Sequence, residues 1–322
     1  MRAVQLQEHG GPEVLRVGEV DDPRPGEGEV LVEVAAAGVN FIDTYQRSGN
    51  YPVDLPHVPG MEGAGRVVDV GPGVEEPAVG SHVAWADAPG SYAEKVVVKA
   101  ERAVPVADGI DLEVAAALML QGMTAHYLSH STAHLGEEDT ILVYAAAGGV
   151  GQLLVQLARR RGARILACTS TDEKARRVTD LGADEVIRYR DVSVPDAVEE
   201  LTEGRGVDVV YDSVGADTFF DSLRCLRPRG LMVLFGQSSG PVPPIDLQEL
   251  NHAGSVYATR PSLFHYVATP DELEWRATTM LDLVGTGQLD VRIHDRVPLD
   301  EAARAHEALE SGTTSGKLLL VP

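Results

Sequence analysis

Hydrophobic and polar positions follow one pattern up to about residue 122 and another beyond it. The first part alternates over short runs that glycine and proline interrupt, as in Gly71-Pro72-Gly73, which is typical of short strands joined by turns. Many short strands predict a barrel-like β domain. We expect strands at 30–34, 65–70, 81–85 and 92–98, and a helix at 112–120 that Asp111 caps.

From residue 123 onward, strand-like runs alternate with amphipathic stretches of helical period. Repeated βα units predict a parallel sheet covered by helices on both faces. From about residue 266 we expect two helices and a last strand at 317–321. Periodicity alone does not show to which domain this last part belongs. The strands of the βα part are expected at 140–145, 164–168, 185–188, 207–212, 231–235 and 255–259. Its helices are expected at 150–161, after the strand at 164–168 through residue 181, at 194–202 and at 217–226.

Composition narrows the class of protein. A length of 322 residues suggests about two domains, since one domain takes ~150 residues. The 27 basic and 49 acidic residues give a formal charge of −22, which repels phosphate backbones and argues against a nucleic-acid partner. An acidic surface adapted to high salt is an open alternative. With two cysteines, no signal-peptide pattern and no run of ~18 apolar residues, we expect a cytoplasmic protein without a membrane span.

The most informative loop is AAAGGVG, residues 145–151, because it follows an apolar strand and opens an amphipathic helix. Its glycine pattern is Ala146-x-Gly148-x-x-Gly151. Gly148 has no Cβ, so a pyrophosphate can approach the backbone, and Gly151 lets the helix pack closely on the sheet. The amides that begin the helix then meet the phosphate. The loop predicts dinucleotide binding; a tight turn in a ligand-free α/β domain is the alternative.

The end of the next predicted strand indicates which dinucleotide is bound. A cofactor with a free ribose 2′-hydroxyl usually meets an acidic residue ~20 positions after the glycines. Here residues 168–170 are Cys-Thr-Ser, and Asp172 and Glu173 come later, where we expect them to cap a helix. Hydroxyls beside Lys174 and two arginines suit a 2′-phosphate. We therefore predict NADP(H) rather than NAD(H). The alternative for Lys174 is that it is an ordinary solvated helix residue without a role in cofactor binding.

Six blocks together carry a specific resemblance that extends over essentially the whole chain. The chain resembles the quinone oxidoreductase (zeta-crystallin-like) branch of the medium-chain dehydrogenase/reductase superfamily. This resemblance implies an α/β protein with a GroES-like β-rich barrel domain, 1–122 and 266–322, and a Rossmann domain, 123–265. It also implies NADPH-dependent reduction of a quinone, by one-electron or hydride transfer, in the cleft between them, and a homodimer. The blocks are GVNFIDTYQRSGNYP (38–52), LPHVPGMEGAGRV (55–67), AALMLQGMTAHYL (116–128), AAAGGVG (145–151), VDVVYDSVG (207–215) and TRPSLFHY (259–266).

Two positions in these blocks lack zinc ligands. Zinc alcohol dehydrogenases of the same superfamily carry cysteine where this chain has Asn40, and histidine where it has Met61. Zinc favours thiolate, imidazole or carboxylate, so these residues do not form a zinc site. The structural zinc lobe needs four cysteines, and no cysteine precedes Cys168. Without a Lewis acid, reduction of an easily reduced acceptor is favoured over alcohol oxidation.

By resemblance, Asn40, Asp43, Tyr45 and Tyr51 line the nicotinamide and substrate cleft as catalytic residues. The two phenols suit this role physically, because their hydroxyls can donate to a developing oxyanion while the rings flank a flat acceptor. The alternatives are that the tyrosines are packed loop residues and that Asp43 caps a helix.

The resemblance also implies a set of cofactor contacts. Ser213 is expected at the end of the fourth Rossmann strand and the trio from Phe235 at the end of the fifth, where such sheets bind ligands. The histidines at 126, 130 and 134 read as a solvated surface helix, and Cys168 and Cys225 as buried thiols. The full set of contacts is Asn40, Gln121, Thr124, Gly148, Gly149, Val150, Ser170, Lys174, Tyr189, Ser213, Phe235, Gly236, Gln237, Arg260 and Lys317.

Other functions are compatible with the same sequence. An NADPH-dependent enal or enone double-bond reductase needs the same cofactor and no metal. A relative that binds RNA, or a sensor that binds the cofactor without turnover, would keep the fold and lose the activity. The negative charge weighs against RNA.

Overall fold

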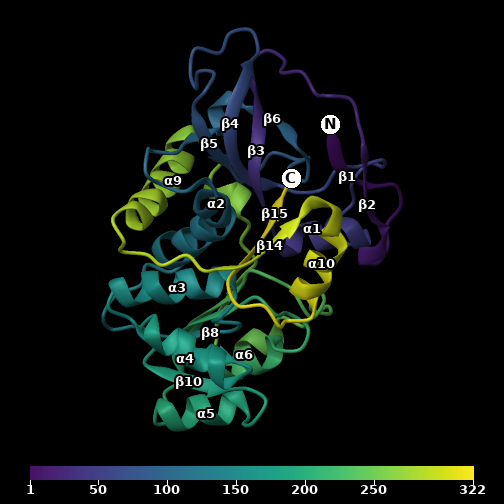
Figure 1. The fold of residues 1–322 in the computed structure, drawn as a ribbon. Coiled ribbons are helices and arrows are strands. Elements are labelled where there is room, and N and C mark those ends of the chain that lie inside the picture. Colours follow the sequence, from purple (N-terminus) through teal and green to yellow (C-terminus); the bar gives the residue numbers. More distant parts are fainter. The chain divides into compact units, whose positions relative to one another are not determined.

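The computed structural model describes residues 1–322, and the chain contacts group it into two compact units, Met1–Met123 with Tyr266–Pro322, and Thr124–His265. Figure 1 follows the chain through both units. None of the helices combines the length and hydropathy that crossing a bilayer requires.

The first unit is built on a seven-stranded sheet, ordered β14-β15-β3-β4-β5-β7 with β6 also paired to β3, beside a two-stranded β1-β2 ribbon. Apart from the parallel β14-β15 pair, its strand pairs are antiparallel. These strands are β1 (Arg2–Leu6), β2 (Leu15–Glu19), β3 (Glu29–Val39), β4 (Glu62–Val70), β5 (His82–Trp85), β6 (Lys95–Lys99), β7 (Val104–Pro105), β14 (Ile293–Pro298) and β15 (Lys317–Val321).

The end of the chain returns to the first unit, because β15 pairs antiparallel with β3, with Leu318 opposite Val39. The strand β14 was not predicted, since its sequence IHDRVP lacks a regular apolar alternation. The helices of this unit are α1 (Phe41–Ser48), α2 (Leu112–Tyr127, which continues past Met123), α9 (Pro270–Gly285) and α10 (Ala302–Glu310).

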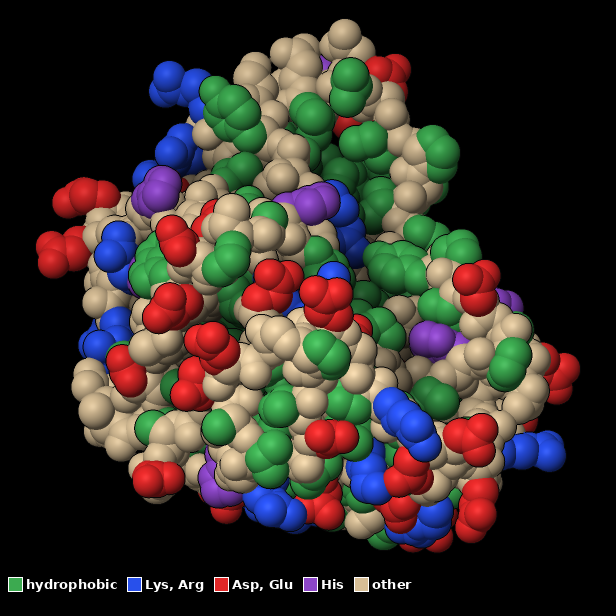
Figure 2. All heavy atoms as spheres, turned by 90° about the horizontal axis from the view of Figure 1, so that it is seen from above, with side chains coloured by type: hydrophobic (Ala, Val, Ile, Leu, Met, Phe, Trp, Pro, Cys, Tyr) green, Lys and Arg blue, Asp and Glu red, His purple; other side chains and the backbone are tan.

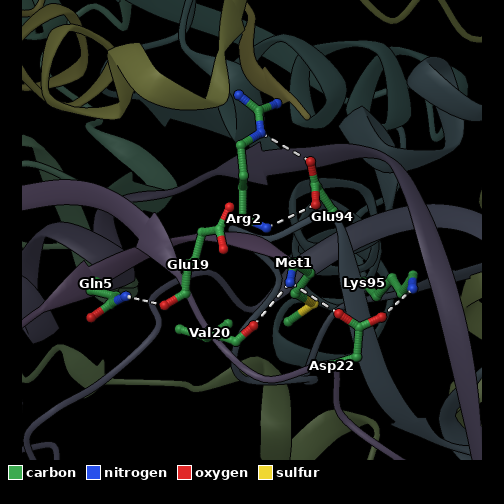
Figure 3. A network of polar contacts seen from close by, with 8 residues as sticks. All are labelled: Met1, Arg2, Gln5, Glu19, Val20, Asp22, Glu94 and Lys95. Atoms are coloured by element: carbon green, nitrogen blue, oxygen red, sulfur yellow. Dashed lines mark hydrogen bonds and ion pairs between the residues drawn. The ribbon is translucent and has the colours of Figure 1, made fainter.

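Surface ion pairs tie β1 to its neighbours (Figure 3). Arg2 Nε lies 2.9 Å from Glu94 Oε1, and Asp22 accepts from both the Met1 ammonium and Lys95. Exposed pairs of this kind contribute little to stability. The unit is held instead by an apolar core in which Trp85, Val32, Val96 and Leu320 are buried.

The second unit is a parallel six-stranded sheet, ordered β10-β9-β8-β11-β12-β13. Counted from β8, this order is 3-2-1-4-5-6, the order typical of dinucleotide-binding sheets. Helices alternate with the strands, which are β8 (Thr140–Val143), β9 (Arg164–Thr169), β10 (Glu185–Arg188), β11 (Val207–Asp212), β12 (Leu226–Leu234) and β13 (Tyr257–Thr259). The helices are α3 (Gly149–Arg160), α4 (Asp172–Asp180), α5 (Val194–Leu201), α6 (Phe219–Cys225), α7 (Gln248–His252) and α8 (Leu263–Tyr266).

Two local expectations need correction. Thr171, not Asp172 or Glu173, caps α4, because its hydroxyl accepts the Lys174 N–H. The segment with the histidines is no solvated helix: His126 is buried in the apolar helix α2, and its ring stacks on His130 with centroids 4.2 Å apart. His134 lies beyond the short π-helix Leu128–Thr132. As expected, Cys168 and Cys225 are buried free thiols, and Asp111 accepts the Glu113 N–H at the start of α2.

Candidate functional site

The turn between β8 and α3 is closely packed where the helix begins. Gly148 stands before α3. The first amides of a helix have no partner inside the helix, and here no side chain caps them either. A Cβ on Gly151 would lie 2.5 Å from the Ala145 oxygen and 2.7 Å from Ala146 Cα, so only glycine allows the helix to begin this close to the turn. At Gly148 a Cβ would meet only the Ala145 oxygen, at 3.1 Å. These features fit a pyrophosphate at Gly148, Gly149 and Val150.

The carboxyl ends of β9 and β10 bring together the side chains expected near a 2′-phosphate. Ser170 directly follows β9, Lys174 lies in the first turn of α4, and the Tyr189 N–H donates to the Thr169 oxygen at 3.3 Å. Burial and then the nearby Arg190 lower the pKa of Lys174. Cations that repel each other and a hydroxyl, with no acidic residue at the end of β9, suit a phosphate better than a ribose diol.

The ends of β11 and β12 also meet. Ser213 follows β11, and Phe235, Gly236 and Gln237 follow β12. A Cβ on Gly236 would lie 2.6 Å from the Ser213 oxygen, so the two loops cross where only glycine fits. Two other candidates lie on other elements: Thr124 is buried in α2, and Arg260 is exposed after β13, its guanidinium 3.5 Å from the Pro261 oxygen.

In the first unit, Asn40 joins the end of β3 to the start of α1, and its side-chain amide is fully engaged. Nδ2 donates to Glu62 Oε2 at 2.8 Å and to the Gly38 oxygen at 3.2 Å. Oδ1 accepts from Lys317 Nζ at 2.7 Å and from Gln121 Nε2 at 3.4 Å. Three residues predicted from the sequence, Asn40, Gln121 and Lys317, are thus brought together, and both amide hydrogens are committed to protein oxygens.

Glu62 and Lys317 form a buried ion pair at the centre of this group, with 0% and 1% of their side chains exposed and 2.5 Å between Oε2 and Nζ. The Leu120 N–H donates to the other Glu62 oxygen at 2.6 Å. A Cβ on Gly38 would lie 2.4 Å from Glu62 Oε2, so this glycine makes room for the pair. Burial lowers the pKa of Lys317, and Glu62 opposes that shift. Sequence reasoning missed Glu62, because its only signal was an acid inside an apolar strand.

These donors do not fit a zinc ion. The Lys317 ammonium lies within hydrogen-bond distance of both Asn40 Oδ1 and Glu62 Oε2, the oxygens a metal at this place would need. A divalent cation would have to displace that charge, and an amide is a poor ligand for zinc. No group of three or more His, Cys, Asp and Glu side chains is gathered so that it could hold a metal.

Asp43 is completely buried in the first turn of α1. Its Oδ2 accepts the Asn40 N–H at 2.9 Å and the Tyr92 hydroxyl at 2.8 Å, whereas Oδ1 has no partner. The expectation that Asp43 caps a helix therefore holds, since it binds the N–H of the residue before α1. Burial, the largest effect, raises the pKa of Asp43 to about 7.

Tyr45 and Tyr51 lie side by side and are half-buried. Their ring centroids are 5.2 Å apart, and the Tyr51 N–H donates to the Tyr45 oxygen at 2.9 Å. The two tyrosine rings are therefore packed against each other, as the alternative to a catalytic role predicted. It leaves the phenols beside Asn40 and Asp43 on the same short helix and the loop after it.

The comparisons with known proteins cover both units. Residues 26–108 match the profile of the alcohol dehydrogenase GroES-like domain, and residues 149–270 that of the zinc-binding dehydrogenase. These two matches confirm the expected fold class.

Over its whole length the chain is similar to named enzymes. It is 45% identical over 323 residues to the quinone oxidoreductase of Salmonella typhimurium, covering 99% of each chain. It is 40% identical over 328 residues to a 2-haloacrylate reductase from Burkholderia sp, covering 99% of this chain and 98% of that one. The crystal structure of Escherichia coli quinone oxidoreductase complexed with NADPH superimposes with a TM-score of 0.98 at 42% identity, with 100% of each chain covered.

Two glycine-dependent loops on a 3-2-1-4-5-6 sheet, joined to a GroES-like unit, define a medium-chain dehydrogenase/reductase. Within that superfamily, the chain belongs to the quinone oxidoreductase family.

Proposed function

We propose that this protein is an NADPH-dependent quinone oxidoreductase that works without a metal. The observation that carries the proposal is the edge of the parallel sheet where β9 ends without an acidic residue and Lys174 lies in the first turn of α4, in a chain similar over its full length to quinone oxidoreductases. NADPH, when bound, supplies the electrons that reduce the quinone.

The chain's own residues would bind and orient. Gly148, Gly149 and Val150 would hold the pyrophosphate, with Ser170, Lys174 and Tyr189 at the 2′-phosphate. The loops with Ser213 and Phe235–Gln237 line the same edge of the sheet and support the remaining contacts. Thr124 and Arg260 are kept as cofactor contacts on the resemblance alone.

On the substrate side, Tyr45 and Tyr51 would donate to the developing oxyanion. Asn40 would serve as a rigid part of the wall, because Glu62, Lys317 and Gln121 hold its amide. Asp43, with no exposed surface, would act through Asn40 and not on the substrate directly.

The test is NADPH oxidation by a panel of quinones, with and without a chelator, in parallel with NADH. We expect turnover with NADPH that the chelator does not change, and a lower kcat/KM with NADH. Tyr51→Phe should lower kcat/KM by roughly tenfold or more if its hydroxyl stabilises the oxyanion. Equal efficiency with NADH, or loss of activity with the chelator, would contradict the proposal.

A second function is favoured by one specific observation, the 40% identity to a 2-haloacrylate reductase. A 2-haloacrylate contains a carbon–carbon double bond conjugated to a carboxylate, and the crystal structure of a 2-haloacrylate reductase superimposes on this chain with a TM-score of 0.87 at 39% identity. Including 2-haloacrylates and enals in the panel separates the two activities, since the better acceptor has the higher kcat/KM.

We also expect a homodimer and a cytoplasmic location, both from the family resemblance. The edge strand β13 supports the dimer, because it lies at the end of the sheet with Tyr257 66% exposed. Analytical ultracentrifugation tests the assembly, and a monomer at micromolar concentration would contradict it.

A further inference from the structure

A chain of hydrogen bonds runs through the interior of the first unit and ends on Asp43. Arg47 Nη1 lies 3.2 Å from His306 Nδ1, and His306 Nε2 lies 3.2 Å from the Tyr92 hydroxyl. That hydroxyl is 2.8 Å from Asp43 Oδ2. Tyr92 and His306 are fully buried and the reaction proposed above gives neither of them a role.

Arg47 forces the direction of every bond in this chain. A guanidinium only donates, so His306 Nδ1 must accept from it and the imidazole proton must lie on Nε2. Nε2 then donates to the Tyr92 oxygen, which leaves the Tyr92 proton to point at Asp43. Arg47 is itself held by Glu310, with Nη2 2.7 Å from Oε1. The chain therefore has one orientation, from a cation to a carboxylate.

The backbone builds a seat for the tyrosine in the middle of the chain. Gly60 has φ +92°, and a Cβ there would lie 2.3 Å from the Tyr92 ring. The Tyr92 N–H donates to the Pro59 oxygen at 3.0 Å, and its ring meets His306 edge-on with centroids 5.8 Å apart. The hydroxyl thus has a fixed position over Asp43.

The same bonds exclude a proton wire from the surface. A wire would need to reload His306 Nδ1 from its neighbour, but the neighbour is Arg47, which does not release a proton in proteins. An oriented chain that conducts nothing can still stabilise the charge at its end, since each bond polarises the next.

We propose that His306 and Tyr92 are positioning residues, which keep a hydrogen bond on the Asp43 carboxylate and so hold Asn40 at the start of α1. The link to Asn40 is direct, because the Asn40 N–H donates to the same oxygen, Oδ2, that Tyr92 contacts. The catalytic consequence rests on the function proposed above.

Asp43 is sensitive to this bond because burial already raises its pKa to about 7. The bonds from Asn40 and Tyr92 and the charge of Lys317 act against burial, and the charge of Glu62 acts with it. Removing the Tyr92 hydroxyl therefore leaves the carboxyl with one hydrogen bond in place of two, and we expect its proton affinity to rise at least about tenfold, one pKa unit.

The first experiment uses the free wild-type protein and needs no turnover. The ¹⁵N shifts of the His306 ring should show a neutral imidazole protonated at Nε2 from pH 5 to 9, and His306→Phe assigns the signals. A ring protonated at Nδ1 or at both nitrogens would overturn the proposal even if no variant folds.

The second experiment follows the Asp43 carboxyl by ¹³C NMR, assigned with Asp43→Asn. Tyr92→Phe should move its midpoint upward, and His306→Phe should move it in the same direction. Tyr211→Phe is the matched control, because Tyr211 is also fully buried and its hydroxyl also donates one hydrogen bond, to the Leu128 oxygen at 2.9 Å. An Asp43 midpoint in Tyr92→Phe equal to that of wild type would refute the proposal.

The activity arm separates the two proposals. In Tyr92→Phe the pH profile of kcat should shift upward with the Asp43 midpoint and activity should recover at high pH, whereas Tyr211→Phe keeps the wild-type profile. Wild-type protein that fails to oxidise NADPH with any acceptor refutes the proposed function and leaves the NMR result standing. Active wild type with an unshifted Tyr92→Phe profile refutes the positioning role alone.

Discussion

Single residues decide how the interior of the first unit is held around Asn40, and most of them are buried and charged. Asn40, Glu62 and Lys317 satisfy one another at distances of 2.5 to 2.8 Å. Burying an ammonium and a carboxylate together is tolerable only while both remain, because either alone would lie uncompensated in the interior.

Lys317→Met should therefore destabilise the protein by roughly 3–5 kcal/mol, measured as the free energy of unfolding in urea. Arg66→Met is the matched control: it breaks an ion pair with Glu33 whose side chains are 53% and 55% exposed, and should cost less than ~1 kcal/mol. Adding Glu62→Gln to Lys317→Met should recover part of the loss. Equal effects of the two single changes would show that Glu62 is not held by Lys317.

His306 makes the protein sensitive to acid. Burial, followed by the charge of Arg47, lowers its pKa to about 3 in the folded state, against ~6.5 in an unfolded chain. Between these values the unfolded state binds more protons, so stability falls as the pH falls from 6.5 toward 3, by up to roughly 4 kcal/mol. In His306→Phe this part of the pH dependence should vanish, as followed by urea unfolding at several pH values. The exposed His252→Phe should keep it.

Asp43 changes the pH dependence of stability in the direction opposite to His306. Its pKa is about 7 when folded and ~3.9 when unfolded, so the folded state binds more protons in between. Its contribution to stability is complete below pH 4 and is lost as the pH rises toward 7. Asp43→Asn should leave a steeper loss of stability on acidification, because the His306 effect is no longer opposed. A slope equal to that of wild type would show that Asp43 keeps an ordinary pKa.

At the scale of elements, the two glycines of the turn before α3 have different expected roles, one in packing and one in cofactor binding. Gly151 is needed for packing, since its Cβ would meet backbone atoms at 2.5 and 2.7 Å, whereas a Cβ on Gly148 would meet only the Ala145 oxygen, at 3.1 Å, which would have to shift by a few tenths of an ångström. What a methyl group at Gly148 would obstruct is the approach of a phosphate to the amides.

Gly148→Ala should weaken NADPH binding at least about tenfold, or 1.4 kcal/mol, with a change in unfolding free energy below ~1 kcal/mol. Fluorescence titration gives the Kd, and urea unfolding gives the stability. Gly73→Ala, at a turn with φ +79° in the other unit, is the control that should leave the Kd unchanged. If Gly148→Ala bound NADPH with wild-type affinity, the pyrophosphate would have to bind at another place.

For the whole molecule, the excess of negative charge is the dominant long-range effect. The formal charge is −22, and Figure 2 shows acidic side chains spread over the visible face. Self-repulsion of this kind destabilises the folded state and is screened by salt. Raising NaCl from about 0.02 to 0.5 M should therefore raise the Tm by a few degrees. A Tm that falls with salt would show that ion pairs outweigh repulsion.

The sequence alone determined the elements whose pattern is local. The strands Glu185–Arg188 and Val207–Asp212 lie where their apolar runs predicted them, and Gly148 and Gly151 indicated the phosphate turn, because each signal comes from neighbouring residues. The family followed from the six sequence blocks that resemble it. The choice of NADP(H) followed from the absence of an acidic residue at 168–170, where β9 ends.

Only the tertiary structure decided what surrounds those elements. The residues next to Glu62, Tyr92 and His306 do not indicate what these side chains contact. Contacts across 22 to 277 positions, such as Asn40 with Glu62 and with Lys317, assemble the polar interior. The strand β14 forms because β15 offers it a partner. The side-chain amide of Asn40, which we expected as a catalytic and cofactor-binding residue, is bonded to Glu62 and Lys317. Burial and pairing arise between distant segments, so periodicity along the chain contains no trace of them.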